Sequence, residues 1–250
     1  MIQIKAIAAR FIEHRPMTDG IHNLFLRALP ENILAQLKPS LQRIALGNGQ
    51  LMDRVDGPVK YVYFVDRGFV SLVKTMRDGR SVEVGGVGIE GLTTPTAILS
   101  SRGAALLEAM VQVPGSALRI ERASLRLVMQ NEPVLLHMIE DYARFQLQQI
   151  AQIAACNRLH SIDQRCCRWL LTAHDNAISD RFSLTHEFLA MMLGTQRSSV
   201  SLVAKVLQKA GLIDYARGMI SVTQRQGLEE EACECYAATQ AEIKALYRNA

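Results

Sequence analysis

Residues 182–222 decide the fold class of this chain and have the sequence FSLTHEFLAMMLGTQRSSVSLVAKVLQKAGLIDYARGMISV. Thr185 is suited to cap a helix, and Glu187 is favourable in the positively charged first turn of that helix. Gly194 supplies the permissive backbone of a tight turn. A second helix is predicted by an apolar stripe at positions i, i+3, i+4 and i+7, formed by Val200, Val203, Ala204 and Leu207.

The opposite face of this second helix is polar and free of acidic residues. It consists of Arg197, Ser201, Lys205 and Gln208 at positions i, i+4, i+8 and i+11. Each of these side chains can donate a hydrogen bond, which suits a helix that enters the major groove of DNA. The face therefore indicates a recognition helix.

A basic hairpin follows the second helix. Gly211 is placed to end the helix. Two short runs, LIDY and MISV, then flank Ala216-Arg217-Gly218, a turn that would present Arg217 to a phosphate backbone. Helix, glycine turn, polar-faced helix and basic-tipped hairpin, in this order, predict a winged helix-turn-helix.

Upstream, residues 41–120 consist of short β-rich runs separated by glycines, among them VKYVYFVDRG, FVSLVKTM, SVEVGGVG, EAMVQVPG and SALRI. Asp78-Gly79 predicts a hairpin turn between the second and third of these runs. Many short strands with frequent turns indicate a small barrel or sandwich. The preceding residues 24–37 have helical spacing, interrupted at Pro30.

A long helix is predicted from Pro133 to Asn157, since this range holds no glycine and no further proline. A heptad-like seam with alternating three- and four-residue steps runs along it through Leu136, Ile139, Ala143, Gln146, Ile150, Ile153 and Asn157. Polar seam positions such as Gln146 can fix the register of a two-stranded interface. The alternative is a helix packed only on its own domain. We expect dimerisation through Leu136, Ile139, Ala143, Ile150 and Ile153.

The composition is that of a globular protein: 250 residues, 49% of them hydrophobic and 21% charged. No stretch approaches the roughly 18 uninterrupted apolar residues that a membrane helix needs. Lys5, Arg10 and Glu13 interrupt the apolar N-terminus, so we expect no signal peptide. All five cysteines lie from Cys156 onward and do not resemble a disulfide framework, which favours a reducing cytoplasm.

Charge is unevenly distributed near the C-terminus. Residues 185–225 carry five basic and two acidic side chains, whereas residues 226–250 carry five acidic and two basic ones. A basic block followed by an acidic tail is compatible with a nucleic-acid partner, although a charge run is commonly just a solvated face. The tail is predicted to end in an acidic helix.

These features together resemble the transcription regulators of the cyclic-AMP receptor protein/Fnr family. The segment containing YFVDRG resembles the β-roll of that family, residues 134–157 its dimer helix, and residues 185–212 its helix-turn-helix, including Gly194 and Arg197. The resemblance implies an α+β chain with a β-roll of the cyclic-nucleotide-binding, jelly-roll type. It divides the chain into a sensor domain with N-terminal helices (1–132), a dimerisation helix (133–160) and a winged helix-turn-helix domain (161–250).

The resemblance also implies a homodimer bound to a two-fold operator. Gln196, Arg197, Ser198 and Leu202 occupy the family's base-reading positions. With the residues that flank them, the expected DNA-binding set is Thr185, Gln196, Arg197, Ser198, Ser199, Ser201, Leu202, Lys205 and Arg217. Many members have an acidic residue where Ser198 stands and an arginine where Leu202 stands. Leucine offers only apolar contacts, so we expect a different operator.

The β-roll retains only part of a cyclic-nucleotide cassette. Its remnant comprises Gly88, Glu90 and Gly91, and Arg102 lies a few residues before Leu106-Leu107-Glu108. The phosphate-binding arginine of the family is missing, and Glu108 stands close to its place, where a negative charge repels phosphate. We expect no control by cyclic AMP and leave the effector unknown. The alternative is a cyclic-nucleotide-responsive member of the family.

The sequence contains few features of a metal site or of an enzyme active site. Iron–sulfur members use clustered cysteines, but Cys233-x-Cys235 is a poor chelate with no nearby histidine, and Cys166-Cys167 diverge on a helix. We therefore expect no metal and no cofactor. A cupin-like oxygenase needs histidines inside the barrel, and none occurs between His22 and His137. We expect no catalytic residue and no enzymatic activity.

The sequence thus predicts a cytoplasmic, homodimeric, DNA-binding transcription factor. Its expected partners are double-stranded DNA, a second copy of the chain and RNA polymerase, with no membrane. A dimeric sensor that binds protein instead of DNA remains the alternative, and the acid-free face of Arg197, Ser201 and Lys205 argues against it.

Overall fold

A computed structural model describes residues 20–177 and 179–248 of the chain. The N-terminal segment, for which we expect no signal peptide, lies outside these residues. The described chain begins with the short helices α1 (Leu24–Arg27) and α2 (Glu31–Leu37), followed by the 3-10 turn η1 (Lys38–Ser40). Buried Asn23 caps α1 and donates its side-chain amide to the carbonyls of Val65 and Gly91, at 2.8 Å each. This contact fastens the N-terminal helices to the sheet.

An antiparallel sheet follows and confirms the expected β segment. Its strands are β1 (Gln42–Leu46), β2 (Leu51–Asp53), β3 (Tyr61–Thr75), β4 (Ser81–Val87) and β5 (Glu108–Glu121), with the short helix α3 (Pro95–Leu99) before β5. The strand order is β1-β5-β3-β4, and β2 pairs with β5. The hairpin between β3 and β4 turns at Gly79, which has φ +84°, as the Asp78-Gly79 pair predicts.

The two longest strands differ from the expectation of short runs, because glycine does not end them. β3 continues through Gly68 and β5 through Gly115, with the register shifting where the two strands meet. A Cβ at Gly68 would lie 2.4 Å from the Val113 carbonyl oxygen, and one at Gly115 would lie 2.0 Å from that of Arg67. The glycines therefore permit a close, bulged approach of two backbones within continuous strands.

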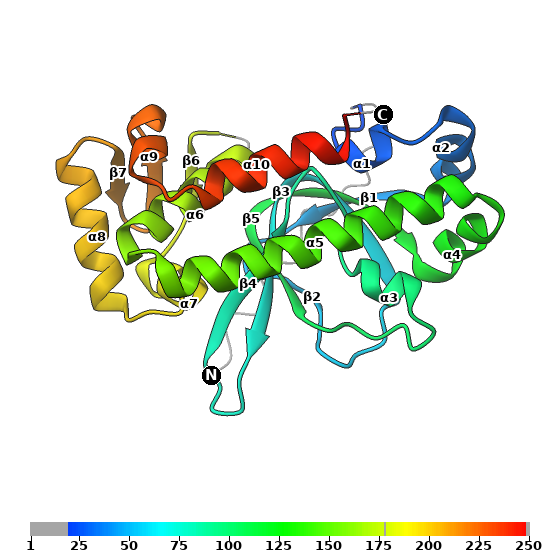
Figure 1. Ribbon diagram of the computed structural model, residues 1–250, viewed down its shortest axis with the longest axis horizontal. Coiled ribbons are helices and arrows are strands. Elements are labelled where there is room, and N and C mark those ends of the chain that lie inside the picture. The colour runs from blue at the N-terminus through cyan, green and yellow to red at the C-terminus, as the bar shows by residue number, and fades with distance from the viewer. Residues whose placement is uncertain (1–19, 178, 249–250) are drawn as a thin grey trace, which may run out of the picture.

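Helices α4 (Arg122–Asn131) and α5 (Pro133–Leu159) come next, and α5 runs across the whole molecule in front of the sheet (Figure 1). The expected long helix is thereby confirmed. Its inner face contributes Ile139 and Tyr142 to a core shared with Phe25 and Phe64. The rings of Phe25 and Tyr142 meet edge to face with centroids 6.2 Å apart, a favourable aromatic geometry.

The last third of the chain forms a mostly helical unit. Its elements are α6 (Ile162–Asn176), β6 (Arg181–Ser183), α7 (His186–Leu193), α8 (Arg197–Lys209), β7 (Ile213–Ala216), β8 (Met219–Val222), α9 (Arg225–Glu231) and α10 (Cys235–Leu246). Strand β6 was not expected, and the acidic tail forms two helices rather than one. Helix α10 turns back and lies along α5 (Figure 1). The α+β class, with sheet, long helix and helix-turn-helix in this order, is confirmed.

One apolar core connects the sheet with the C-terminal unit. Phe69 and Val113 of the sheet pack in the same buried cluster as Trp169 of α6. Close by, buried Glu83 of β4 accepts hydrogen bonds from the Ser71 hydroxyl and from the Trp169 indole, the latter at 3.1 Å. Burial raises the pKa of Glu83. Among the described residues, no helix is both long and apolar enough to cross a membrane.

Candidate nucleic-acid interface

The two central helices of the interface are joined as the sequence predicts. The Thr185 hydroxyl accepts a hydrogen bond from the Phe188 amide at 3.2 Å and thereby caps α7. Gly194 ends α7 with φ +60°, a left-handed conformation that favours glycine. Helix α8 then begins at Arg197 and buries its stripe, Val200, Val203, Ala204 and Leu207, against the core.

The outer face of α8 is open to solvent. Gln196, Arg197, Ser198 and Lys205 are exposed there. Two apolar side chains are exposed on the same helix, Leu202 at 66% and Val206 at 55%. The structure thus brings the expected base-reading side chains onto one surface that combines hydrogen-bond donors with apolar contact area. Sequence spacing did not single out Val206, although it lies only four positions from Leu202.

Ser201 has a different place from the one its helical spacing suggests. It is half-buried, donates its hydroxyl to the Arg197 carbonyl at 3.0 Å and lies 2.9 Å from His186 Nδ1. The His186 ring stacks on Tyr215 of β7, with ring centroids 4.3 Å apart. Burial and the charge of Arg197 lower the pKa of His186. Ser201 therefore helps to join α7, α8 and the hairpin through a histidine that the sequence did not implicate in DNA binding.

The predicted hairpin is present as the wing of the domain. β6, β8 and β7 form a three-stranded antiparallel sheet in that order. Arg217 stands exposed at the β7–β8 turn with φ +53°, next to Gly218 with φ +76°. A Cβ at Gly218 would lie 4.0 Å from the Thr185 methyl group, so the turn lies beside the N-terminus of α7.

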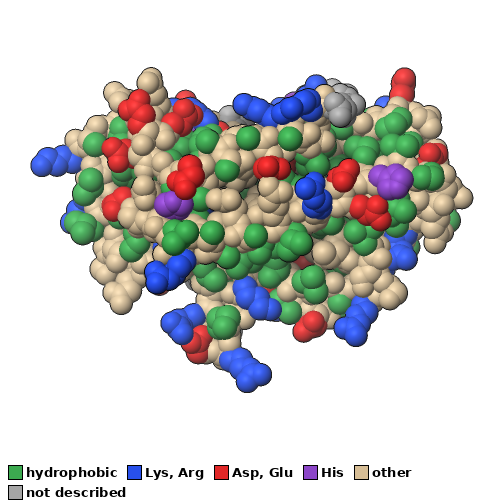
Figure 2. Space-filling model, viewed as in Figure 1, with side chains coloured by type: hydrophobic (Ala, Val, Ile, Leu, Met, Phe, Trp, Pro, Cys, Tyr) green, Lys and Arg blue, Asp and Glu red, His purple; other side chains and the backbone are tan. Residues whose placement is uncertain are grey.

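A groove of about 1310 Å³ separates the first turn of α8 from the β3–β4 hairpin. Its lining includes Arg80 and Ser81 on the hairpin and Gln196, Arg197 and Ser199 on the helix side. The tip of the hairpin projects from the body of the molecule and carries exposed basic side chains (Figure 2), namely Lys74, Arg77 and Arg80. The first turn of α8 therefore faces the hairpin across this groove, where Arg80 is paired with Asp78 at 2.7 Å.

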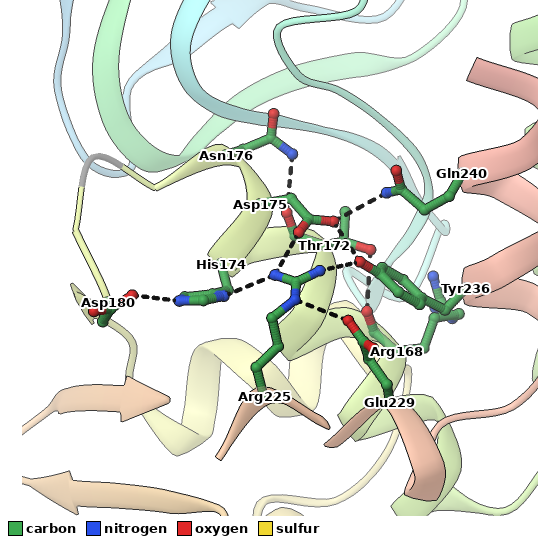
Figure 3. A network of polar contacts seen from close by, with 10 residues as sticks. All are labelled: Arg168, Thr172, His174, Asp175, Asn176, Asp180, Arg225, Glu229, Tyr236 and Gln240. Carbon is green, nitrogen blue, oxygen red and sulfur yellow. Dashed lines mark hydrogen bonds and ion pairs between the residues drawn. The ribbon is translucent and has the colours of Figure 1, made fainter. Parts of the chain in front are cut away.

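An ion-pair network fixes the elements behind the wing (Figure 3). Arg225, the first residue of α9, contacts Asp175 at 2.7 Å, Glu229 at 2.8 Å and the Tyr236 hydroxyl at 2.5 Å. The Tyr236 hydroxyl in turn donates to Asp175 at 2.8 Å. Asp175 belongs to α6 and Tyr236 to α10, so one guanidinium connects three helices. The Arg225–Glu229 pair has the i,i+4 spacing of a helix, whereas the contact with Asp175, 50 positions away, follows only from the packed fold.

The expected dimerisation residues are divided between core and surface. Ile139 and Ile153 are buried within the chain itself, at 0% and 8% exposure. Leu136, Ala143 and Ile150 are half-buried. Beside them along α5, Leu147 is 68% exposed. The free apolar face of α5 is therefore rotated slightly from the seam that spacing alone suggests.

The remnant of the cyclic-nucleotide cassette, Gly88, Glu90 and Gly91, makes hydrogen bonds within itself and contacts α5. The Gly88 amide donates to the Glu90 carboxylate at 2.9 Å, and burial raises the pKa of Glu90. A Cβ at Gly91 would lie 2.0 Å from the Tyr142 ring of α5. Arg102 is exposed at the surface, and Glu108 accepts a hydrogen bond from the Thr75 hydroxyl at 2.9 Å.

The cysteines correct one expectation. Cys233 and Cys235 do have a nearby histidine, because α10 folds back onto the end of α5 and brings them to Cys156 and His160. Cys235 Sγ lies 3.6 Å from His160 Nδ1, and Cys156 Sγ lies 3.5 Å from Cys233 Sγ. The sequence separation of more than 70 residues conceals this cluster. Cys166 and Cys167 are buried in α6, where burial raises the pKa of both thiols.

Comparison with known proteins identifies the C-terminal unit. Residues 164–231 match the family model of the Crp-like helix-turn-helix domain. No curated protein matches the chain by sequence. Among solved structures, FixK2 from Bradyrhizobium japonicum is similar with a TM-score of 0.64 at 18% identity, over 77% of this chain and 98% of its own.

Two further structures share the fold. A putative transcriptional regulator of the Crp/Fnr family from Eubacterium rectale has a TM-score of 0.64 at 15% identity, over 82% of this chain and 95% of its own. The c-di-GMP responsive global regulator CLP from Xanthomonas campestris has a TM-score of 0.62 at 18% identity, over 77% and 98%. The domain match and the shared fold confirm the resemblance inferred from the sequence.

Proposed function

Because residues 164–231 are a Crp-like helix-turn-helix domain on a chain with the fold of Crp/Fnr regulators, we propose that this protein is a sequence-specific, DNA-binding transcription regulator. The observation that carries the proposal is the outer face of α8, which is exposed and free of acidic side chains. DNA presents base edges between two rows of phosphates, so an acid-free face of donors is favourable there.

The individual side chains have different tasks in this proposal. Arg197, in the first turn of α8, reads a guanine by bidentate hydrogen bonds, and Leu202 contacts a thymine methyl group. Lys205 and Arg217 neutralise phosphates, Arg217 from the tip of the wing. The surface that faces DNA in this proposal also includes Thr185, Gln196, Ser198 and Ser199. Ser201 supports the surface through His186 rather than touching DNA.

The protein acts as a homodimer in this proposal, since two copies of α8 are needed to read a two-fold operator. The free apolar face of α5 is the proposed dimer interface, with Leu136, Ala143 and Ile150 from the expected seam and exposed Leu147 beside them. The regulator acts in the cytoplasm on RNA polymerase. It is not controlled by cyclic AMP in this proposal, because the Gly88 amide already binds the Glu90 carboxylate and Glu108 stands close to the place of the missing arginine.

Selection of bound sequences from random duplex DNA by the full chain tests the proposal. We expect enrichment of one two-fold sequence. On that site, Arg197→Ala should cost about 1–3 kcal/mol and flatten discrimination at one base pair per half-site. Arg217→Ala should weaken all sequences equally and lower the salt-dependence slope by about one per subunit, because one fewer counterion is released.

Lys244→Ala provides the matched control, because Lys244 is an exposed cation on α10, away from α8 and the wing. Its affinity and salt slope should equal those of the unmodified chain. Failure to enrich any sequence, with binding that Arg197→Ala leaves unchanged, would overturn the proposal and favour a protein partner instead.

A further inference from the structure

Four side chains with metal-binding chemistry converge where α10 begins. The sulfur atoms of Cys156, Cys233 and Cys235 and a ring nitrogen of His160 all lie within 4.8 Å of one another. Cys156 is in the last turn of α5 and His160 directly follows that helix, whereas Cys233 and Cys235 flank the junction of α9 and α10. The three cysteines are buried and His160 is half-buried, so the cluster is largely enclosed.

The spacing of these atoms suits a tetrahedral metal ion. With Zn–S bonds of about 2.3 Å, two sulfurs of a tetrahedral zinc site lie about 3.8 Å apart. The observed distances are 3.5 Å between Cys156 and Cys233 and 3.6 Å between Cys235 Sγ and His160 Nδ1. Small displacements are sufficient to place an ion at the centre. Three thiolates and one imidazole form a known ligand set of structural zinc.

The orientation of His160 is a second, independent observation. Its Nε2 lies 3.1 Å from the Glu234 carboxylate, which leaves Nδ1 directed at Cys235. Histidine ligands of metals are commonly held in this way by a carboxylate on the other ring nitrogen, which fixes the tautomer and raises ligand basicity. Glu234 is itself 76% exposed and has no evident role in packing.

Buried positive charge lies close to the cluster, since Arg165 and Arg168 both interact electrostatically with Cys156. Arg165 and Arg168 are both only 8% exposed, and the Nε atom of each is without a hydrogen-bond partner among the described residues. Zinc with three thiolates carries a net charge of minus one, so these buried cations complement such a centre.

We propose that Cys156, His160, Cys233 and Cys235 bind one zinc ion per chain in a closed tetrahedral site that fastens the start of α10 to the end of α5. All four ligands come from the protein, which leaves no open position for catalysis and gives the ion a structural role. The site lies next to the network of Arg225, Asp175 and Tyr236 (Figure 3), so both sides of the α9–α10 junction are held.

Elemental analysis of the full chain, purified under reducing conditions after expression with zinc, tests the proposal. We expect one zinc per chain. A strong chelator should lower the Tm of this protein, since loss of a ligand that binds only the folded state removes its stabilisation. Replacement by Co²⁺ should give the intense visible bands of tetrahedral cobalt and a thiolate charge-transfer band in the near ultraviolet.

Variants separate this site from incidental thiols. Cys233→Ser combined with Cys235→Ser should abolish stoichiometric zinc and the chelator effect, whereas Cys166→Ala, at a buried cysteine outside the cluster, should retain both. Glu234→Gln alters only an exposed side chain and should fold normally while weakening zinc affinity about 10–100-fold. If the double cysteine variant does not fold, the zinc affinity of Glu234→Gln still tests the site.

Several results would overturn the proposal. One is the absence of stoichiometric zinc from the reduced chain even after zinc is added. Another is a Cys156–Cys233 disulfide in anaerobically isolated protein, which would indicate a redox pair in place of a metal site. Unchanged zinc content in the double cysteine variant would likewise exclude these ligands, and unchanged affinity in Glu234→Gln would exclude the role given to Glu234 in orienting His160.

Discussion

At the scale of single residues, Asp53 is held in an unfavourable environment. It lies on β2 with 9% exposure, and its Oδ2 atom has no hydrogen-bond partner among the described residues. Burial raises the pKa of Asp53 from 3.8 to about 6. A carboxylate that must remain charged in such a place lowers the stability of the fold, so pH should report on this residue directly.

Between pH 3.8 and 6 the folded chain binds a proton at Asp53 that the unfolded chain has released, so stability falls as pH rises through this window. Asp53→Asn removes this contribution. Relative to the variant, the unmodified chain should lose about 2–3 kcal/mol between pH 4 and pH 7. Urea unfolding of both proteins across this range measures the difference. A difference that does not change with pH would show that Asp53 keeps an ordinary pKa.

The same scale shows where sequence patterns suffice and where they fail. The capping Thr185, the turn Gly194 and the exposed Arg197 follow from local rules, because their roles depend on neighbours within a few positions. The His186–Ser201 contact and the cluster around Cys156 join residues 15 and 77 positions apart. No periodicity encodes such pairs, so only the packed fold reveals them.

At the scale of elements, α5 shows the limit of a heptad pattern. Its length and position follow from the absence of helix breakers after Pro133. The pattern could not show which apolar side chains of the helix are buried within the chain. Ile139 packs in a core shared with the sheet, and Ile153 is also buried. β3 and β5 illustrate a related limit, since glycines that resemble strand ends serve a close crossing of backbones.

Leu147→Glu tests the proposed interface on α5. The side chain is 68% exposed, so the change should leave the fold of one chain intact while placing a charge in the dimer contact. Sedimentation should show a monomer, with weaker binding to a two-fold operator. Leu127→Glu is the control, because Leu127 is 64% exposed on α4 and should leave the dimer intact. An unchanged dimer in Leu147→Glu would place the interface elsewhere.

At the scale of the whole molecule, the β-roll and the helix-turn-helix are physically joined. Val82 of β4 packs against the turn glycine, with its Cγ2 3.0 Å from where a Cβ at Gly194 would lie. A ligand that displaced β4 would therefore move the turn before the recognition helix. The cassette remnant is also in contact with other parts of the chain, since a Cβ at Gly91 would lie 2.0 Å from the Tyr142 ring and the Tyr247 hydroxyl donates to the Glu90 carbonyl.

We accordingly expect millimolar cyclic AMP or cyclic GMP to leave both the Tm and the operator affinity unchanged. A ligand that binds the folded state raises the Tm by mass action, so thermal unfolding with and without nucleotide is a sensitive measurement. A dose-dependent rise in Tm with cyclic AMP would show that the cassette still binds its nucleotide.

The hydrogen bond between Trp169 and Glu83 gives the protein an optical reporter. Trp169 is the only tryptophan of the chain, and its ring lies in the core shared by the sheet and the DNA-binding unit. All indole fluorescence therefore arises from this one junction. Its emission should be that of a dry environment while the two units are packed together, and should shift to longer wavelength if water enters between them. Movements of one unit against the other can thus be followed in solution without an attached dye.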